Sequence, residues 1–70
     1  MAEYILNEVN TLRTESGVTQ EDLAAHVNVS RQTIIAIEKG NYTPSVLLAI
    51  KIAQYFKTPV EKVFTIKYGK

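Results

Sequence analysis

Residues 20–40 read QEDLAAHVNVSRQTIIAIEKG and contain two short amphipathic segments on either side of Asn28. Both segments carry apolar residues at helical spacing, such as Leu23 and Val27 in the first and Ile34 and Ile37 in the second. Asparagine tolerates the left-handed backbone that a tight turn between two helices requires. The small residue Ala24 allows the two helices to cross closely. The stretch therefore predicts two short helices, over about 20–27 and 31–39, that meet at a tight turn.

Capping residues and glycines mark where the neighbouring helices begin and end. Serine and threonine hydroxyls accept hydrogen bonds from free N–H groups at a helix start, and glycine suits the left-handed position after a helix end. On this basis Thr19, Ser30 and Ser45 cap the helices that follow them, and Gly17 and Gly40 end the helices that precede them. We therefore expect a first helix over about 5–15 and a fourth over about 46–56.

The C-terminal residues combine a helix start with a strand pattern. Thr58-Pro59-Val60-Glu61 matches a capping box with proline at the first helical position, which predicts a short fifth helix. Apolar and polar residues then alternate over about 64–68, with the period of a β-strand. This strand must pair with Glu3–Leu6 or with a second copy of the chain. Residues 1–70 are thus expected to form one all-α, five-helix domain with short terminal β-strands.

The length and composition of the chain exclude several classes of function. Its 70 residues leave little room for a closed catalytic cavity, and no nucleophile–base pair is apparent, so an enzyme is not expected. The sequence has no cysteine and one histidine, which excludes disulfides and multi-ligand thiolate or histidine metal sites. We expect no cofactor and no small-molecule ligand. The chain lacks an apolar run of about 18 residues and a basic leader, so we expect a cytoplasmic protein that makes no membrane contact.

Charge is unevenly distributed along the chain, although the net charge is only +1. Residues 1–22 contain one basic and five acidic residues, a net charge of −4. Residues 23–70 contain seven basic and two acidic residues, a net charge of +5. The basic part of the chain is suited to a polyanion such as DNA, and on charge alone a mixed, solvated surface is an equal alternative.

The second helix of the pair, over about 31–39, has a buried face and a face suited to DNA. On a helical wheel Ile34 and Ile37 lie on the buried arc together with Glu38. The outward positions are those of Gln32, Ile35, Ala36 and Lys39, with Arg31 at the helix entrance. Arginine can form two hydrogen bonds with guanine and glutamine two with adenine, and the start of such a helix reaches the bases.

We therefore predict that Arg31 and Gln32 contact DNA bases. Thr33 and Ile35 complete the predicted base-contacting set. Thr33 is also suited to a phosphate contact, and Ile35 either packs on a thymine methyl group or contacts protein.

Six short segments of the chain match one known pattern: Leu12-Arg13, Thr19-Gln20-Glu21-Asp22-Leu23-Ala24, Val29-Ser30-Arg31-Gln32-Thr33-Ile34, Ile37-Glu38-Lys39-Gly40, Pro44-Ser45 and Lys51-Ile52-Ala53. Through them, residues 12–64 resemble the Cro/repressor (XRE-type) helix-turn-helix family of bacterial and phage regulators. The resemblance covers about three quarters of the chain and implies a five-helix, phage-repressor-like fold whose third helix reads DNA. The whole chain also resembles small standalone members of the family that act as dimers and have short terminal strands.

The resemblance implies roles for several residues outside the reading helix. Gln20 is expected to contact a phosphate and to brace the residue that starts the third helix. Arg13 is expected to form an ion pair with Glu38 that locks the first helix to the third, because a buried carboxylate without a partner is costly. Glu38→Ala should therefore destabilise the fold rather than alter sequence preference. Further phosphate contacts are expected around the third-to-fourth loop, from Lys39, Asn41, Tyr42 and Ser45.

The expected partners are double-stranded operator DNA and a second copy of the chain. The proposed role is a homodimeric repressor that reads an inverted repeat. Dimer contacts are predicted from the apolar fourth helix, the fifth helix and the C-terminal strand, although the same residues would also suit an intramolecular core: Leu47, Ile50, Val63, Phe64 and Ile66. An antitoxin that neutralises a toxin protein, and a module that binds only protein, are the alternatives that use the same fold.

Overall fold

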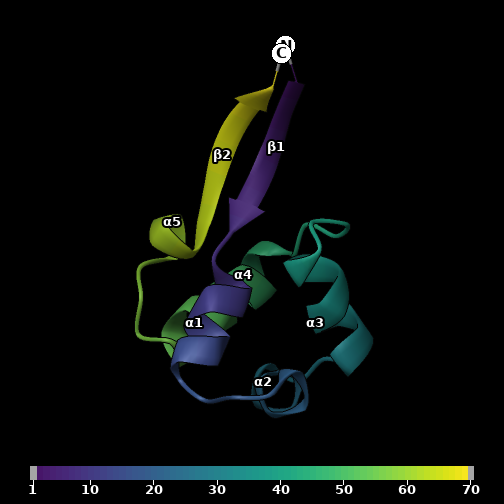
Figure 1. Ribbon diagram of the computed structural model, residues 1–70, viewed down its shortest axis with the longest axis vertical. Coiled ribbons are helices and arrows are strands. Elements are labelled where there is room, and N and C mark those ends of the chain that lie inside the picture. Colours follow the sequence, from purple (N-terminus) through teal and green to yellow (C-terminus); the bar gives the residue numbers. More distant parts are fainter. Residues whose placement is uncertain (1, 70) are drawn as a thin grey trace.

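A computed structural model of the chain describes residues 2–69, which form a helical body and a two-stranded ribbon (Figure 1). The strands are β1 (Ala2–Asn7) and β2 (Phe64–Gly69). The helices are α1 (Val9–Glu15), α2 (Gln20–Val27), α3 (Arg31–Glu38), α4 (Val46–Tyr55) and α5 (Val60–Val63). None of the helices within residues 2–69 has the length and apolar character needed to cross a bilayer.

Side-chain caps start the three central helices, as the sequence predicts. The Thr19 hydroxyl accepts a hydrogen bond from the Asp22 N–H at 3.0 Å, and the Asp22 carboxylate accepts one from the Thr19 N–H, which completes a capping box. Ser30 and Ser45 cap α3 and α4 in the same manner. Asn28 ends α2 in the left-handed conformation, with φ 64° and ψ 47°. These caps and the left-handed Asn28 confirm the predicted bounds of α2 and the predicted start of α3.

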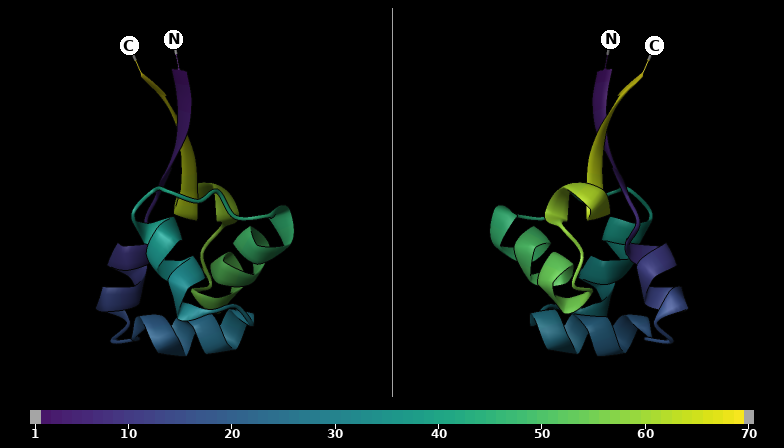
Figure 2. Two further views of the ribbon diagram at one scale, coloured as in Figure 1. Left: turned by 90° about the vertical axis from the view of Figure 1, so that its right-hand side faces the viewer. Right: turned by 90° about the vertical axis from the view of Figure 1, so that its left-hand side faces the viewer.

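The core lies between the helices and consists of ten buried apolar residues: Val9, Leu23, Ala24, Val27, Ile34, Ile37, Leu48, Ile52, Ala53 and Val63. Ala24 is only 3% exposed, and α2 and α3 pack closely on each other. Burial of each large aliphatic side chain contributes about 1.5–3 kcal/mol. The core therefore fixes α3 on the body from one side and leaves its other side on the surface (Figure 2).

The antiparallel ribbon of β1 and β2 corrects two sequence predictions. Ile5 pairs with Ile66 in the ribbon, so Ile5 lies in a strand and not in the first helix. The helix begins at Val9, and just before it the Asn7 side chain accepts a hydrogen bond from the Val9 N–H and donates one to the Ile37 carbonyl. The ribbon also means that the fold is not strictly all-α. It projects from the helical body in every view (Figures 1 and 2).

The predicted capping box at Thr58 is wrong. Thr58 instead closes α4, because its N–H donates to the Ala53 carbonyl at 3.0 Å while Lys57 adopts a left-handed φ of 53°. The Thr58 hydroxyl donates to the Phe56 carbonyl. Pro59 is therefore the residue before α5 rather than its first residue, and α5 begins at Val60 without a side-chain cap.

Candidate nucleic-acid interface

The start of α3 presents two long polar side chains to solvent. Arg31 and Gln32 are both exposed, immediately after the capping residue Ser30. One turn further along the helix, Ile34 and Ile37 are fully buried in the core. The helix is thus anchored from beneath and offers a guanidinium and an amide, the two groups that pair with guanine and adenine through two hydrogen bonds each.

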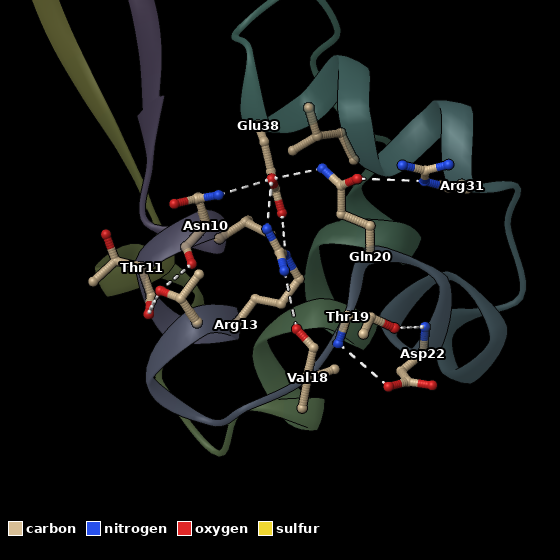
Figure 3. A network of polar contacts seen from close by, with 12 residues as sticks. Asn10, Thr11, Arg13, Val18, Thr19, Gln20, Asp22, Arg31 and Glu38 are labelled. Carbon is tan, nitrogen blue, oxygen red and sulfur yellow. Dashed lines mark hydrogen bonds and ion pairs between the residues drawn. The ribbon is translucent and has the colours of Figure 1, made fainter.

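A hydrogen-bonded ion pair connects the end of α3 to α1 (Figure 3). Arg13 Nε donates to Glu38 Oε2 at 2.7 Å, and Arg13 Nη2 donates to Glu38 Oε1 at 3.3 Å. The third arginine nitrogen, Nη1, donates to the Val18 carbonyl at 3.0 Å. Only 13% of the Arg13 side chain and 7% of the Glu38 side chain are exposed. The structure therefore brings together the two residues that the sequence predicts as partners.

The Glu38 carboxylate also accepts hydrogen bonds from two neutral amides. Asn10 Nδ2 and Gln20 Nε2 each donate to Oε1 at 3.1 Å. Burial by itself raises the pKa of the Glu38 carboxyl group, but the hydrogen bonds from Arg13, Asn10 and Gln20 and the charge of Arg13 outweigh it and hold this pKa below its ordinary value of 4.5. The hydrogen bond to Glu38 likewise raises the pKa of Arg13.

Gln20 extends this network to the exposed start of α3. Its Nε2 faces Glu38, and its Oε1 faces Arg31, whose Nε donates to it at 3.4 Å (Figure 3). At this length the hydrogen bond is weak, because most N–H···O bonds lie between about 2.7 and 3.2 Å. Gln20 thus has two contacts in the structure. One is the expected contact with Arg31, and the other is a hydrogen bond to Glu38 that the sequence did not predict.

The remaining predicted base-contacting residues are less accessible than Arg31 and Gln32. Thr33 and Ile35 are half-buried. The Thr33 hydroxyl lies 3.2 Å from the Ser30 hydroxyl, so it already has a hydrogen-bond partner within its own helix start. Ala36 is also half-buried, although the helical wheel places it outward. The exposed part of α3 is thus narrower than predicted.

Three of the four predicted phosphate-contacting residues around the α3–α4 loop, Lys39, Tyr42 and Ser45, line two grooves. Thr33, Tyr42 and Ser45 line a groove of about 250 Å³, and Tyr42 also lies with Lys39 in a larger groove beside the ribbon. Asn41 is exposed and lines neither of the two. Lys51 of α4 lines the smaller groove, although no DNA contact was predicted for it from the sequence. Its signal was the sparse polar stripe on an otherwise apolar helix.

The predicted dimer residues divide into buried and exposed groups. Val63 is fully buried in the core of its own chain, which is the intramolecular alternative for these residues, and Phe64 is half-buried and packs against the same core. Leu47 and Ile50 of α4 and Ile66 of β2 are 66%, 42% and 56% exposed. Two residues that the prediction omitted extend the exposed apolar surface of α4 and α5, namely Val46 at 76% and Val60 at 38%.

Two short helices packed through Ala24, with the second helix lying at the surface, define a helix-turn-helix domain. The chain belongs to the XRE-type helix-turn-helix family of DNA-binding transcription regulators, whose profile matches residues 9–63. It is 53% identical, over 83% of its own length and 88% of the relative's, to an uncharacterized HTH-type transcriptional regulator of Methanocaldococcus jannaschii.

Two further proteins resemble the chain more distantly. The cryptic phage CTXphi transcriptional repressor RstR of Vibrio cholerae is 28% identical over 81% of this chain, which spans 51% of that repressor. The crystal structure of the restriction-modification controller protein C.AhdI from Aeromonas hydrophila superimposes with a TM-score of 0.73 and 25% identity, over 79% of this chain and 83% of the controller.

Proposed function

We propose that this protein is a homodimeric repressor that reads an inverted-repeat operator in double-stranded DNA through α3. The observation that carries the proposal is the pair of exposed side chains, Arg31 and Gln32, at the start of a surface helix whose other side is buried. The similarity to a protein named as a transcriptional repressor supports repression as the sign of regulation.

Base reading is assigned to the first turn of α3. Arg31 donates its Nε to Gln20 in a long hydrogen bond, and both terminal amino groups are left for the N7 and O6 atoms of a guanine. Gln32 follows as the residue that pairs with adenine. The half-buried Ile35 is assigned a thymine methyl contact, because it lies one turn after Arg31. Thr33, which directly follows the exposed pair, is assigned a base-edge or phosphate contact.

Phosphate contacts are assigned to the residues that flank α3. The set surrounds the starts of α2 and α4, where free N–H groups favour an anion. It comprises Gln20, Lys39, Asn41, Tyr42 and Ser45, and Lys51 joins it because it lines the same groove as Tyr42 and Ser45. These contacts fix the orientation of α3 in the major groove and carry no sequence information themselves.

The exposed apolar surface of α4 and α5 is the proposed dimer contact. Val46, Leu47, Ile50 and Val60 lie there, although single exposed apolar residues are ordinary on a protein surface. Two copies related by a two-fold axis would place their α3 helices in successive major grooves, about 34 Å apart. A dimer bound across a promoter would repress transcription by occluding it.

Selection from random duplex DNA at about 50 and 200 mM salt tests the proposal. We expect an enriched inverted repeat whose preference survives the higher salt. Weak and unselective binding that disappears at the higher salt would refute sequence-specific reading. The enriched sequence also supplies the operator that the variants described below require.

Sedimentation of purified variants tests the dimer. Ile50→Lys should produce monomers and lose the inverted repeat, because it places a charge in the proposed apolar contact. Thr11→Lys adds the same charge at an exposed position on α1 and should leave the dimer intact. Ile66→Lys tests in the same way whether the ribbon contributes to the dimer contact. A dimer that tolerates both isoleucine substitutions would refute the predicted contact.

A further inference from the structure

We infer that Glu38 positions Arg31 for base recognition through the side chain of Gln20, and so controls sequence preference from a site beneath the DNA-reading surface. The inference rests on the proposed DNA-binding function and deepens it. From the sequence alone Glu38 receives only a structural role. The connection that changes this is the chain of two hydrogen bonds from Glu38 to Gln20 and from Gln20 to Arg31 (Figure 3).

The charge of Glu38 determines which way the Gln20 amide is oriented. A carboxylate only accepts hydrogen bonds, whereas an amide has an NH₂ donor at one end and an oxygen acceptor at the other. Gln20 must therefore turn its Nε2 toward Glu38, and its Oε1 then faces Arg31. The reverse orientation would place two acceptors together at Glu38 and two donors together at Arg31, whose guanidinium has no acceptor.

The Glu38 carboxylate is itself held firmly enough to act as this reference. Arg13 donates to both of its oxygens. Arg13 is fixed in turn by the Val18 carbonyl. The network thus begins on α1, passes through the end of α3 and the start of α2, and returns to the start of α3.

The position of Arg31 along α3 makes the bridge through Gln20 necessary. Glu38 lies seven residues after Arg31, which is about two turns and roughly 10 Å along the helix axis. The side chains of Arg31 and Glu38 are therefore connected through a third side chain, that of Gln20 on α2. With its Nε directed at Gln20, the Arg31 guanidinium can offer its two terminal amino groups side by side to the O6 and N7 atoms of a guanine.

Two substitutions break this chain at different points. Glu38→Gln keeps the shape of the side chain but gives it a donor as well as an acceptor, so the Gln20 amide is no longer forced into one orientation. Gln20→Met removes both hydrogen bonds, keeps a similar length, and leaves the Arg13–Glu38 pair intact. Asn10→Ala is the matched control, because it removes one hydrogen bond to Glu38 on the side away from Arg31.

The readout is base preference measured position by position on the selected operator. Arg31→Ala first identifies the base pair that Arg31 reads, as the position at which preference is lost. A bidentate arginine–guanine pair discriminates roughly 5- to 150-fold. We expect Glu38→Gln and Gln20→Met to reduce preference at that base pair by roughly threefold to tenfold, which is part of the discrimination that the arginine provides. Asn10→Ala should change it little.

A purely structural role gives a different result. Loosening of α3 would weaken preference equally at the base pair read by Gln32, which serves as an internal control. In the Arg31→Ala background, Glu38→Gln should have no further effect at the affected base pair, because no guanidinium remains to be positioned. A uniform loss at all positions, or an unchanged profile in both variants, would overturn the inference.

Failure of this inference is distinguishable from failure of the proposed function. An unmodified protein that shows no sequence preference refutes both. An unmodified protein that selects an operator, with a preference profile unchanged by Gln20→Met, refutes only the positioning role. Gln20→Met answers the question even where Glu38→Gln fails to fold.

Discussion

Replacement of Glu38 by alanine tests the energetic weight of the ion pair beneath α3. The substitution leaves Arg13 Nε and Nη2 without their acceptor, on a side chain that is only 13% exposed. Removal of one partner from a buried ion pair costs about 3–5 kcal/mol. Arg13 keeps its hydrogen bond to the Val18 carbonyl and has some access to water, so we expect a smaller loss of about 2–4 kcal/mol. A chain of 70 residues has a free energy of unfolding of roughly 4–10 kcal/mol, so the loss is a large fraction of the total.

Urea unfolding at pH 7, followed by circular dichroism, measures this loss directly. The chain concentration must be the same for all variants, because dimerisation makes apparent stability concentration-dependent. The double variant Arg13→Met with Glu38→Leu should lose less than the two single variants together, since apolar side chains of similar volume can replace a buried pair. A midpoint of Glu38→Ala that equals that of the unmodified protein would refute the reasoning.

Four further outcomes follow from the described contacts. Arg31→Ala should cost about 1–3 kcal/mol of binding free energy on the selected operator and relax preference at one base pair. Lys39→Ala should weaken binding to all sequences alike and reduce the slope of log affinity against log salt by about one unit; identical profiles for the two variants would contradict these separate roles. Asn28→Ala should lower the free energy of unfolding by about 1 kcal/mol, whereas Asn28→Gly should cost less, because Asn28 has a φ of 64°. Stability should fall in acid: the lowered pKa of Glu38 gives stability that is complete above its ordinary value of 4.5 and lost as pH falls through the lower folded value, a loss that urea titrations should find diminished in Glu38→Gln.

The sequence predicted the two central helices well because their signals are local. The Thr19 capping box, the Ser30 cap and the left-handed Asn28 each act within three or four residues, so the bounds of α2 and the start of α3 required no knowledge of the rest of the fold. The exposure of Gln32 followed from helical periodicity, and that of Arg31 from its place at the helix entrance.

The errors occurred where two local patterns competed and tertiary contacts decided between them. Ile5 fits both a helix face and a strand pairing, and the choice depends on β2, which lies about sixty residues away in the chain. Thr58 suits a helix start, but its N–H donates instead to the Ala53 carbonyl at the end of α4. Val63 suits both a dimer contact and the core of its own chain, and the choice depends on how α5 packs against the core.

If the proposed base reading holds, the polar network couples recognition to stability in this fold. Arg31 and Gln32 project away from the core, so their replacement should change the DNA sequence that is read at little cost to folding. Glu38 differs because its carboxylate holds α1 to α3 and, by our inference, also orients Gln20 beneath Arg31. A substitution there must satisfy both requirements at once. New sequence preferences should therefore arise through the outward residues of α3, while the acidic side chain at position 38 is kept as long as Arg13 and Gln20 are its partners.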